Sequence, residues 1–181
     1  MKTQLIALAL TSVLFSAGAQ AAVSGKIEAK LVIDNGCEVT NGSTVDGNIN
    51  DFGTLDFGKA APTWVNVLGA ELVGSGTGGK LEVTCSPGVT SFNVAIDGGL
   101  RGSRTLLRDS GAAGTAADQV DYKVFRDGVR TVEYPIDTPV AFAVPADGSA
   151  VQVPVYGSIA PNSAAKTAGT FTDTLLVNIT F

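Results

Sequence analysis

This chain contains six Asn-Gly or Asp-Gly dipeptides, and they constrain its fold more than any other feature. They are Asn35-Gly36, Asn41-Gly42, Asp46-Gly47, Asp97-Gly98, Asp127-Gly128 and Asp147-Gly148. Each supplies a residue that tolerates the positive φ of hairpin turns. Val, Thr, Ile and Phe recur in short runs between them, a pattern typical of strands. We therefore expect many short strands joined by turns, and almost no helix.

The expected strands cover residues 80–85, 91–96, 122–126, 140–144, 150–159 and 170–181. Short strands at this spacing favour an all-β sandwich. The aromatic side chains are most simply the core of that sandwich.

The first 21 residues are typical of a cleaved export signal. Lys2 precedes an apolar stretch over residues 5–15, and Ala19-Gln20-Ala21 matches an A-x-A cleavage site. The apolar stretch is shorter than the roughly 20 residues that span a bilayer. We expect the mature chain to begin at Ala22, with no membrane insertion and enough length for one domain with a core.

Residues 23–33 alternate between apolar and polar side chains, as a strand with one buried face does. Ser24, Lys26, Glu28 and Lys30 form the polar row, with Val32 as its exception. The other row contains Val23, Gly25, Ile27, Ala29, Leu31 and Ile33. An apolar row has to be buried somewhere, and one plausible place is another molecule.

The last expected strand has the same alternation. Its apolar row is interrupted by Asp173 and contains Phe171, Leu175, Val177, Ile179 and Phe181. No residues follow that would form a hairpin partner. We therefore expect a seven-stranded immunoglobulin-like sandwich that lacks its final strand, beside a spare strand at the other end of the chain.

The two cysteines predict a disulfide. In an exported chain, Cys37 and Cys85 are expected to be paired, since such compartments are oxidising. Closing a loop of this size stabilises the fold by about 4 kcal/mol in the chain-entropy model.

Residue types argue against several functions. The chain has no histidine, which removes Ser-His-Asp catalysis and most zinc sites. Without Lys2 it has 11 basic and 17 acidic residues, a net charge of −6 that disfavours nucleic-acid binding. We predict no catalytic residues, no metal and no cofactor, although carboxylate pairs for glycoside hydrolysis stay open at this point.

Two motifs match ligand loops only formally. Gly74 to Gly79 fits G-x-G-x-x-G, but an alternating strand pattern follows where a nucleotide site requires a helix. Residues 46–57 begin like a calcium loop, yet Asp51 replaces its glycine and Phe57 its final glutamate. We interpret both as inter-strand loops.

An ordered set of motifs resembles the spore coat protein U domain, and within it the major subunits of archaic, Csu-type chaperone–usher pili. The set is Cys37-x-Val39, Phe52-Gly-Thr-Leu-Asp-Phe57-Gly, Arg104-Thr-Leu106, Tyr122-Lys-Val-Phe-Arg-Asp127, Val155-Tyr-Gly-Ser-Ile159 and Gly169-Thr-Phe to Phe181. The resemblance covers essentially the whole mature chain.

The resemblance implies a non-enzymatic subunit completed by donor-strand complementation. Residues 1–21 would be the signal peptide, 22–34 the donor strand and 35–181 the pilin domain. The donor row begun by Val23 would fill the groove of a neighbouring copy, whose acceptor residues would be those of the row from Phe171 to Phe181. A periplasmic chaperone would first fill that groove, with the Phe181 carboxylate as an anchor for its basic residues.

An outer-membrane usher would then exchange chaperone for subunit, and tip or minor subunits would join the filament. The chain would thus pass through the periplasm to the cell surface, where the pilus serves adhesion and biofilm formation. Alternatives are a self-contained, lectin-like secreted domain, a minor or tip pilus subunit, and a secreted hydrolase, for which no residue signature exists.

Overall fold

The computed structural model describes residues 24–40, 43–45, 49–75, 80–110 and 115–181. The chain divides into two units, Met1–Ile33 and Asp34–Phe181, which are described separately. The expected signal peptide and Val23 lie outside the described residues. Within the described part, no helix is long and apolar enough to cross a membrane.

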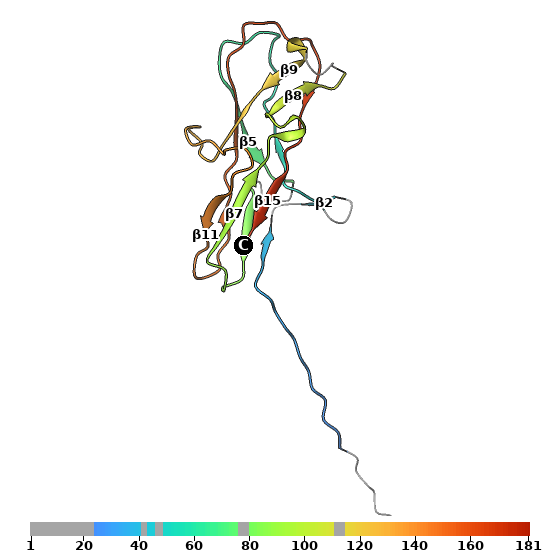
Figure 1. Cartoon of the computed structure of the whole chain (residues 1–181), viewed down its shortest axis with the longest axis vertical. Helices are drawn as coiled ribbons and strands as arrows, with labels where there is room; N and C mark the ends of the chain where they lie inside the picture. The colour runs from blue at the N-terminus through green and yellow to red at the C-terminus, as the bar shows by residue number, and fades with distance from the viewer. Residues whose placement is uncertain (1–23, 41–42, 46–48, 76–79, 111–114) are drawn as a thin grey trace, which may run out of the picture. The chain divides into compact units, whose positions relative to one another are not determined.

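Residues 34–181 form short antiparallel strands arranged in several sheets (Figure 1). Two of these sheets matter most for function, and each has three strands. One has the order β1 (Cys37–Val39), β6 (Glu82–Cys85), β12 (Val151–Gln152). The other has the order β11 (Val140–Ala143), β7 (Ser91–Ile96), β15 (Val177–Thr180).

The remaining elements complete the body. A four-stranded sheet has the order β10 (Lys123–Phe125), β13 (Tyr156–Ile159), β5 (Leu68–Val73), β4 (Thr54–Leu55). A third three-stranded sheet has the order β14 (Phe171–Thr172), β8 (Thr105–Arg108), β9 (Gln119–Asp121), and β2 (Ser43–Val45) pairs with β3 (Ile49–Asp51). The short 3₁₀ helices are η1 (Gly99–Arg101) and η2 (Ala116–Asp118).

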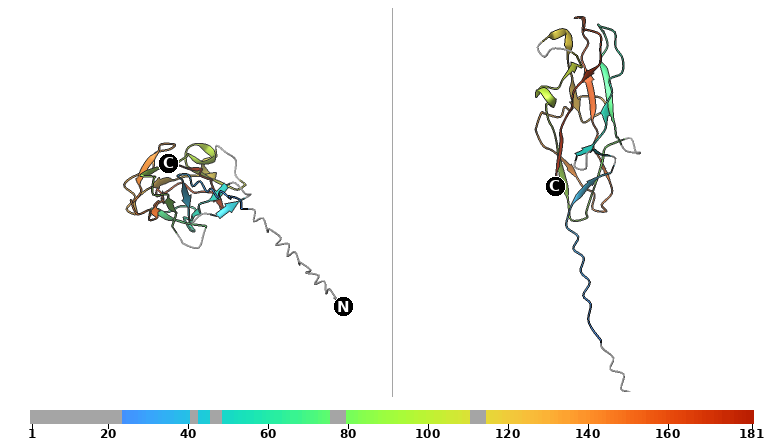
Figure 2. Two further views of the ribbon diagram at one scale, coloured as in Figure 1. Left: turned by 90° about the horizontal axis from the view of Figure 1, so that it is seen from below. Right: turned by 90° about the vertical axis from the view of Figure 1, so that its right-hand side faces the viewer.

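One apolar core lies between these sheets, whose arrangement in the body can be followed in Figures 1 and 2. Every second residue of β7 is buried, and Phe92, Val94 and Ile96 meet Val83 of β6 and Ile159 of β13 in the same cluster. Strands that alternate in this way bury one face each and pack face to face. The predicted all-β sandwich is confirmed, and Phe92 and Tyr122 belong to its core, as expected of the aromatics.

Two expected strands are interrupted. Residues 150–159 form β12 and β13 with a gap at Pro154, which has no N–H to donate to a ladder. Residues 170–181 form β14, paired with β8, and β15, paired with β7. The chain therefore changes sheets between Thr172 and Val177, where a single continuous strand was predicted.

Polar contacts explain this change of sheet. The Asp173 carboxylate is buried and accepts hydrogen bonds from the Tyr122 hydroxyl (2.8 Å) and the Leu100 N–H (3.0 Å). Its Oδ1 atom also lies 3.4 Å from Nη1 of Arg101. The Leu176 N–H donates to the Asp97 carboxylate (2.9 Å), at the end of β7. These contacts fix the chain just before β15 begins.

The prediction of glycine-centred hairpin turns is wrong at several of the dipeptides. Among the four that the structure describes, only Gly148 has a positive φ, of 71°. After Asp127 the positive φ falls on Arg130 instead, because the Asp127 carboxylate accepts the N–H groups of Thr131 and Val132 and holds the turn. Asn41-Gly42 and Asp46-Gly47 lie outside the described residues.

The predicted disulfide is present and joins the edge strand β1 to the core strand β6. Cys37 lies directly opposite Cys85 in the ladder, with their Cα atoms 4.0 Å apart. Because β6 is held from its other side by β12, the bond ties β1 to the middle of its sheet.

We predict that Tyr122→Phe lowers the free energy of unfolding by about 1–2 kcal/mol, because the buried Asp173 carboxylate loses a hydrogen bond. Guanidinium denaturation at pH 7 measures the loss. The matched control is Tyr156→Phe, since the Tyr156 hydroxyl makes no hydrogen bond within the described part of the chain.

Burial, with the hydrogen bond to Asp173, raises the pKa of Tyr122 above its ordinary value. The native hydroxyl therefore stays protonated while the unfolded one ionises above pH about 10, so wild-type stability falls there. The difference in the free energy of unfolding between wild type and Tyr122→Phe should therefore become smaller above that pH. A difference that stays constant, or a Tyr156→Phe variant equally destabilised at pH 7, would contradict this assignment.

Candidate functional site

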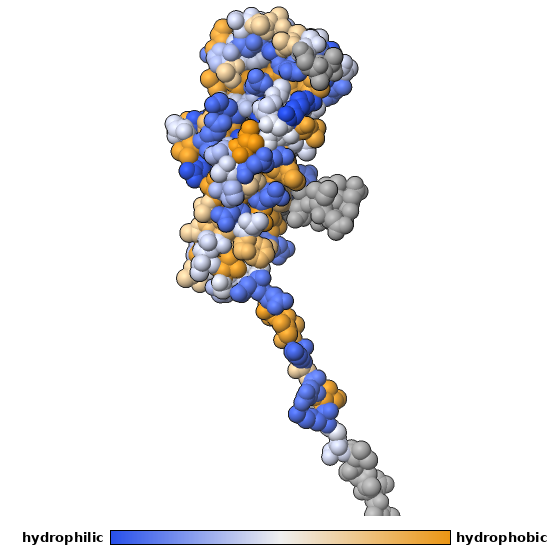
Figure 3. All heavy atoms as spheres, in the orientation of Figure 1, coloured by the Kyte–Doolittle hydropathy of each residue, from blue (hydrophilic) through white to orange (hydrophobic). Residues whose placement is uncertain are grey.

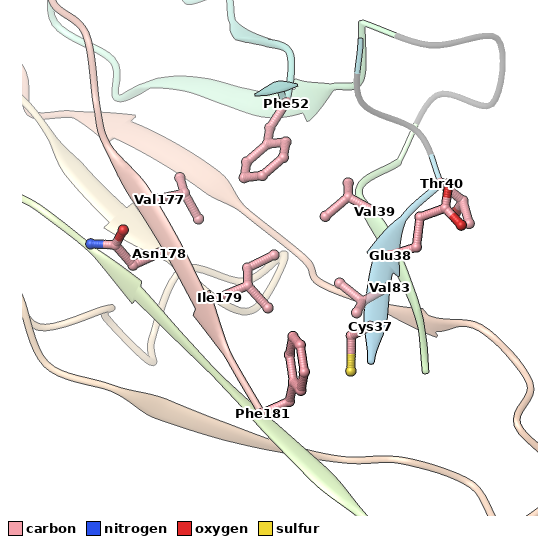
Figure 4. Close-up of a pocket in the computed structure, with 10 residues that line it drawn as sticks. All are labelled: Cys37, Glu38, Val39, Thr40, Phe52, Val83, Val177, Asn178, Ile179 and Phe181. Carbon is pink, nitrogen blue, oxygen red and sulfur yellow. The ribbon is translucent and has the colours of Figure 1, made fainter. Parts of the chain in front are cut away.

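A groove with a volume of about 620 Å³ runs between β1 and β15. Figure 4 shows Cys37 and Val39 of β1 facing it from one side and Val177, Ile179 and Phe181 from the other. Phe52 and Val83 also line it, and Val83 is fully buried in the core. The groove is thus an opening to the hydrophobic core between two strands.

Both strands beside the groove are sheet edges. β1 pairs with β6, β15 pairs with β7, and neither has a second partner among the described residues. An unpaired strand edge exposes a row of N–H and C=O groups that can pair with another strand.

The ladder pattern shows which backbone groups are free. The Asp97 N–H donates to the Leu176 carbonyl (3.1 Å), so the alternation of an antiparallel ladder directs the groups of Asn178 and Thr180 toward β7. Those of Val177 and Ile179 then face the groove. On β1, Gly36 and Thr40 bond to the β6 side, which leaves the backbone groups of Cys37 and Val39 free.

Side chains alternate in the same way along β15. Val177 and Ile179 are half-buried, and Asn178 and Thr180 are exposed. In Figure 4, Asn178 points away from the groove while its two neighbours point into it. The wall that β15 provides is therefore apolar.

A tight turn places Phe52 in the groove. The Asp51 carboxylate accepts the Gly53 N–H (2.9 Å), and Gly53 has a φ of 120°. A Cβ atom at Gly53 would collide with the Val73 carbonyl oxygen at the end of β5. Glycine is required there, because L side chains rarely adopt that φ.

The residues expected to line an acceptor groove separate into two groups. Val177, Ile179 and Phe181 line the groove. Phe171 lies on β14 and Leu175 between the two strands; both pack against the core, as Val177 and Ile179 do, but neither lines the groove. Sequence reasoning missed Val39, Phe52 and Val83 as lining residues; the motif Cys37-x-Val39 contained a signal for the first, since residues two apart on a strand share a face.

The apolar row at the N-terminal end is exposed in this single chain. Residues 24–33 have no strand assignment. Ile27 is 95% exposed, Leu31 83% and Ile33 81%. Ala29 is also exposed, and Gly25 has nothing within 4 Å of its Cβ position. Figure 3 shows hydrophobic and hydrophilic side chains following one another along this segment.

No group of three or more His, Cys, Asp or Glu side chains within the described ranges is placed to hold a metal ion. The segment that begins like a calcium loop and the G-x-G-x-x-G motif, both interpreted above as inter-strand loops, lie partly outside those ranges, at residues 46–48 and 76–79.

Comparison with solved structures finds 18 similar chains. One of them is similar over 82% of this chain and 40% of its own length, with 15% identity and a TM-score of 0.46. It is the crystal structure of the CsuC-CsuE chaperone–tip adhesion subunit pre-assembly complex, from archaic chaperone-usher Csu pili of Acinetobacter baumannii. This chain therefore matches well under two thirds of that chain's length. Comparison with curated proteins gives no match.

Comparison with protein families is decisive. The model of the Spore Coat Protein U domain matches residues 23–178, which is most of the chain and includes β1 and the first two residues of β15. This confirms the resemblance seen in the sequence motifs. The chain belongs to the Spore Coat Protein U domain family.

Proposed function

We propose that this chain is a structural subunit of an archaic chaperone–usher pilus, and that residues 22–34 of a neighbouring copy fill its groove. The observation that carries this proposal is the presence, in one chain, of a groove between two free strand edges, with apolar side chains such as Val39, Val177 and Ile179 on its walls, and of an exposed segment with one apolar row. Membership of the family supports it, because the sequence motifs most resemble Csu-type pilins.

The backbone of an inserted strand would satisfy both edges of the groove. Its N–H and C=O groups would pair with those of Val177 and Ile179 on one side and of Cys37 and Val39 on the other. In such strand addition, main-chain hydrogen bonds supply affinity and alternate side chains supply register.

The side chains are complementary as well. The wall from Val177 to Phe181 extends over four residue steps, or about 14 Å at roughly 3.4 Å per residue. This length accommodates three inward-facing side chains of an extended segment. Two sets of three consecutive inward-facing residues end nearest the body: residues 27, 29 and 31, and residues 29, 31 and 33. Leu31 belongs to both sets.

Burial of the donor row is a strong driving force. Burying Val23, Ile27, Ala29, Leu31 and Ile33 would contribute roughly 7–12 kcal/mol as an upper bound. That is comparable to the stability of an ordinary domain. Exchange of a chaperone strand for the donor strand can then proceed without ATP.

The donor and the groove are different surfaces of the subunit, so the contact is head to tail. Such heterologous contacts generate an open filament when the rotation between subunits does not close into a ring. We propose a surface pilus for adhesion and biofilm formation, in the role of major subunit, with a periplasmic chaperone, an outer-membrane usher, and tip or minor subunits as further partners. Chaperone contact includes the Phe181 carboxylate, and the subunit has no catalytic role.

We predict that Leu31→Asp abolishes polymers whereas Val32→Asp does not. The two residues are neighbours and both are exposed and apolar, but only Leu31 belongs to the row that enters the groove. Unboiled samples on a denaturing gel measure the result, as a ladder of polymers or a monomer band. Loss of the ladder in both variants, or in neither, would contradict the assignment of the row.

We predict that Ile179→Asp weakens binding of a synthetic peptide of residues 22–34 by at least about 100-fold, since it places a carboxylate in the apolar groove. Asn178→Asp is the matched control, because Asn178 points away from the groove. Fluorescence anisotropy with the chain lacking residues 22–33 measures both affinities. Equal affinities in the two variants would exclude this groove as the binding site.

Deleting residues 22–33 separates this proposal from a self-contained secreted domain. The shortened chain should still bind the chaperone but should form no polymers. A stable, chaperone-free monomer that does not bind the peptide would favour the lectin-like alternative.

A further inference from the structure

The residues that connect the N-terminal segment to β1 are anchored to the chain beyond β6. The Ser86 N–H donates to the Gly36 carbonyl (2.8 Å), and the Gly36 N–H donates to Oγ of Ser86 (3.0 Å). The Ser86 hydroxyl also donates to Oδ1 of Asn35 (3.4 Å). The ladder between β1 and β6 thus continues past Cys37 as far as Gly36.

Gly88 is part of the same arrangement. A Cβ atom at Gly88 would lie 2.6 Å from Oδ1 and 2.9 Å from Nδ2 of Asn35. The Asn35 amide therefore packs directly on the Gly88 backbone. We call Asn35, Gly36, Ser86 and Gly88 the exit clamp.

Asn-Gly is the strongest hairpin dipeptide, and here it precedes β1 without forming a turn. Gly36 does not have a positive φ. A hairpin at this position would let residues 24–33 fold back beside β1 of the same chain. Because only Asp34, Asn35 and Gly36 separate Ile33 from β1, a strand beside β1 would have to be antiparallel to it.

The length of such a turn decides which row faces the groove. A two-residue turn at Asn35-Gly36 places Asp34 opposite Cys37 and Val32 opposite Val39. Lys30 and Glu28 then belong to the groove-facing row. This register is unfavourable, because two charged side chains would be buried against the apolar side chains of the groove walls. A three-residue turn over 34–36 places Ile33 opposite Cys37 and Leu31 opposite Val39, which brings the apolar row inward.

The favourable turn therefore needs both Asn35 and Gly36, and the exit clamp holds both. With the clamp closed, a reversal has to use Asp34 and earlier residues. A turn that still directs the apolar row inward then includes Ile33 itself. Ile33 is lost from the strand, and Leu31 no longer lies opposite Val39.

We propose that the exit clamp selects the partner of the groove: it prevents the segment of residues 22–34 from filling the groove of its own chain, so that a second copy must supply the strand. This inference rests on the proposed donor-strand function. Subunits with closed clamps remain able to polymerise. A subunit whose groove is filled by its own segment could neither accept a strand from another copy nor donate one.

The test is a competition between the chain's own segment and an added one. The chain from Ala22 is refolded, with its disulfide intact, at low concentration in an excess of fluorescent peptide of residues 22–34. Size-exclusion chromatography separates peptide-bound chains from folded monomers that exclude the peptide. Ser86→Ala removes the hydroxyl that accepts the Gly36 N–H and donates to Asn35, and Gly88→Ala displaces the Asn35 amide from the other side; both variants keep the Asn35-Gly36 dipeptide.

We expect each variant to raise the ratio of peptide-free monomer to peptide-bound chain about fivefold over wild type, the effect of one net hydrogen bond. Gly128→Ala is the matched control, since Gly128 is exposed and a Cβ atom there makes an ordinary contact of 3.5 Å with the Tyr156 ring. It should leave the ratio at the wild-type value.

The same variants without residues 22–33 separate the two proposals. These shortened chains should all bind the peptide as the shortened wild type does, because no internal competitor remains. If they bind it and the full-length ratios do not change, the clamp proposal is wrong and the donor-strand function stands. If the shortened wild type does not bind the peptide, the donor-strand function fails and the clamp proposal fails with it.

Discussion

The central constraint in this structure is a pair of free strand edges, on β1 and β15, that lie on either side of an opening to the core. Their backbone N–H and C=O groups have no strand to pair with among the described residues. β1 is held by its ladder and disulfide to β6, and β15 by its ladder to β7. The Asp97 and Asp173 carboxylates fix the chain where it enters β15. Each edge strand is thus held from its far side, and the apolar side chains between them, among them Phe52 and Val83, have no strand covering them within the described part of the body.

Most β proteins protect their edges with charges, proline, bulges or covering loops. On β15 the groove-facing residues are Val177, Ile179 and Phe181, and Asn178 and Thr180 face the other way. This side of the groove is therefore well suited to accept a strand. The same chain has an exposed segment with the matching alternation, and the proposed function assigns that segment of a second copy to the groove.

Alternation of side chains was enough to predict the all-β class, the strand Ser91–Ile96 and the apolar row of β15. It did not predict the change of sheet at Asp173, because Tyr122 and Arg101 are distant in the sequence. Buried Arg104 was missed as well, because alternation does not show that a charged side chain has backbone acceptors: its guanidinium donates to the carbonyl oxygens of Ile96, Asp97 and Tyr134. Asn35-Gly36 favoured a local turn, but pairing with Ser86 overrides that preference.

Hydrogen exchange at the free edge tests the central claim most directly. The amides of Val177 and Ile179 should exchange rapidly in the chain lacking residues 22–33 and slowly in the polymer, because a donor strand would bond to them. The amides of Asn178 and Thr180, which already face β7, should change little. Equally rapid exchange of Val177 and Ile179 in both states would show that no strand occupies the groove and would contradict the account.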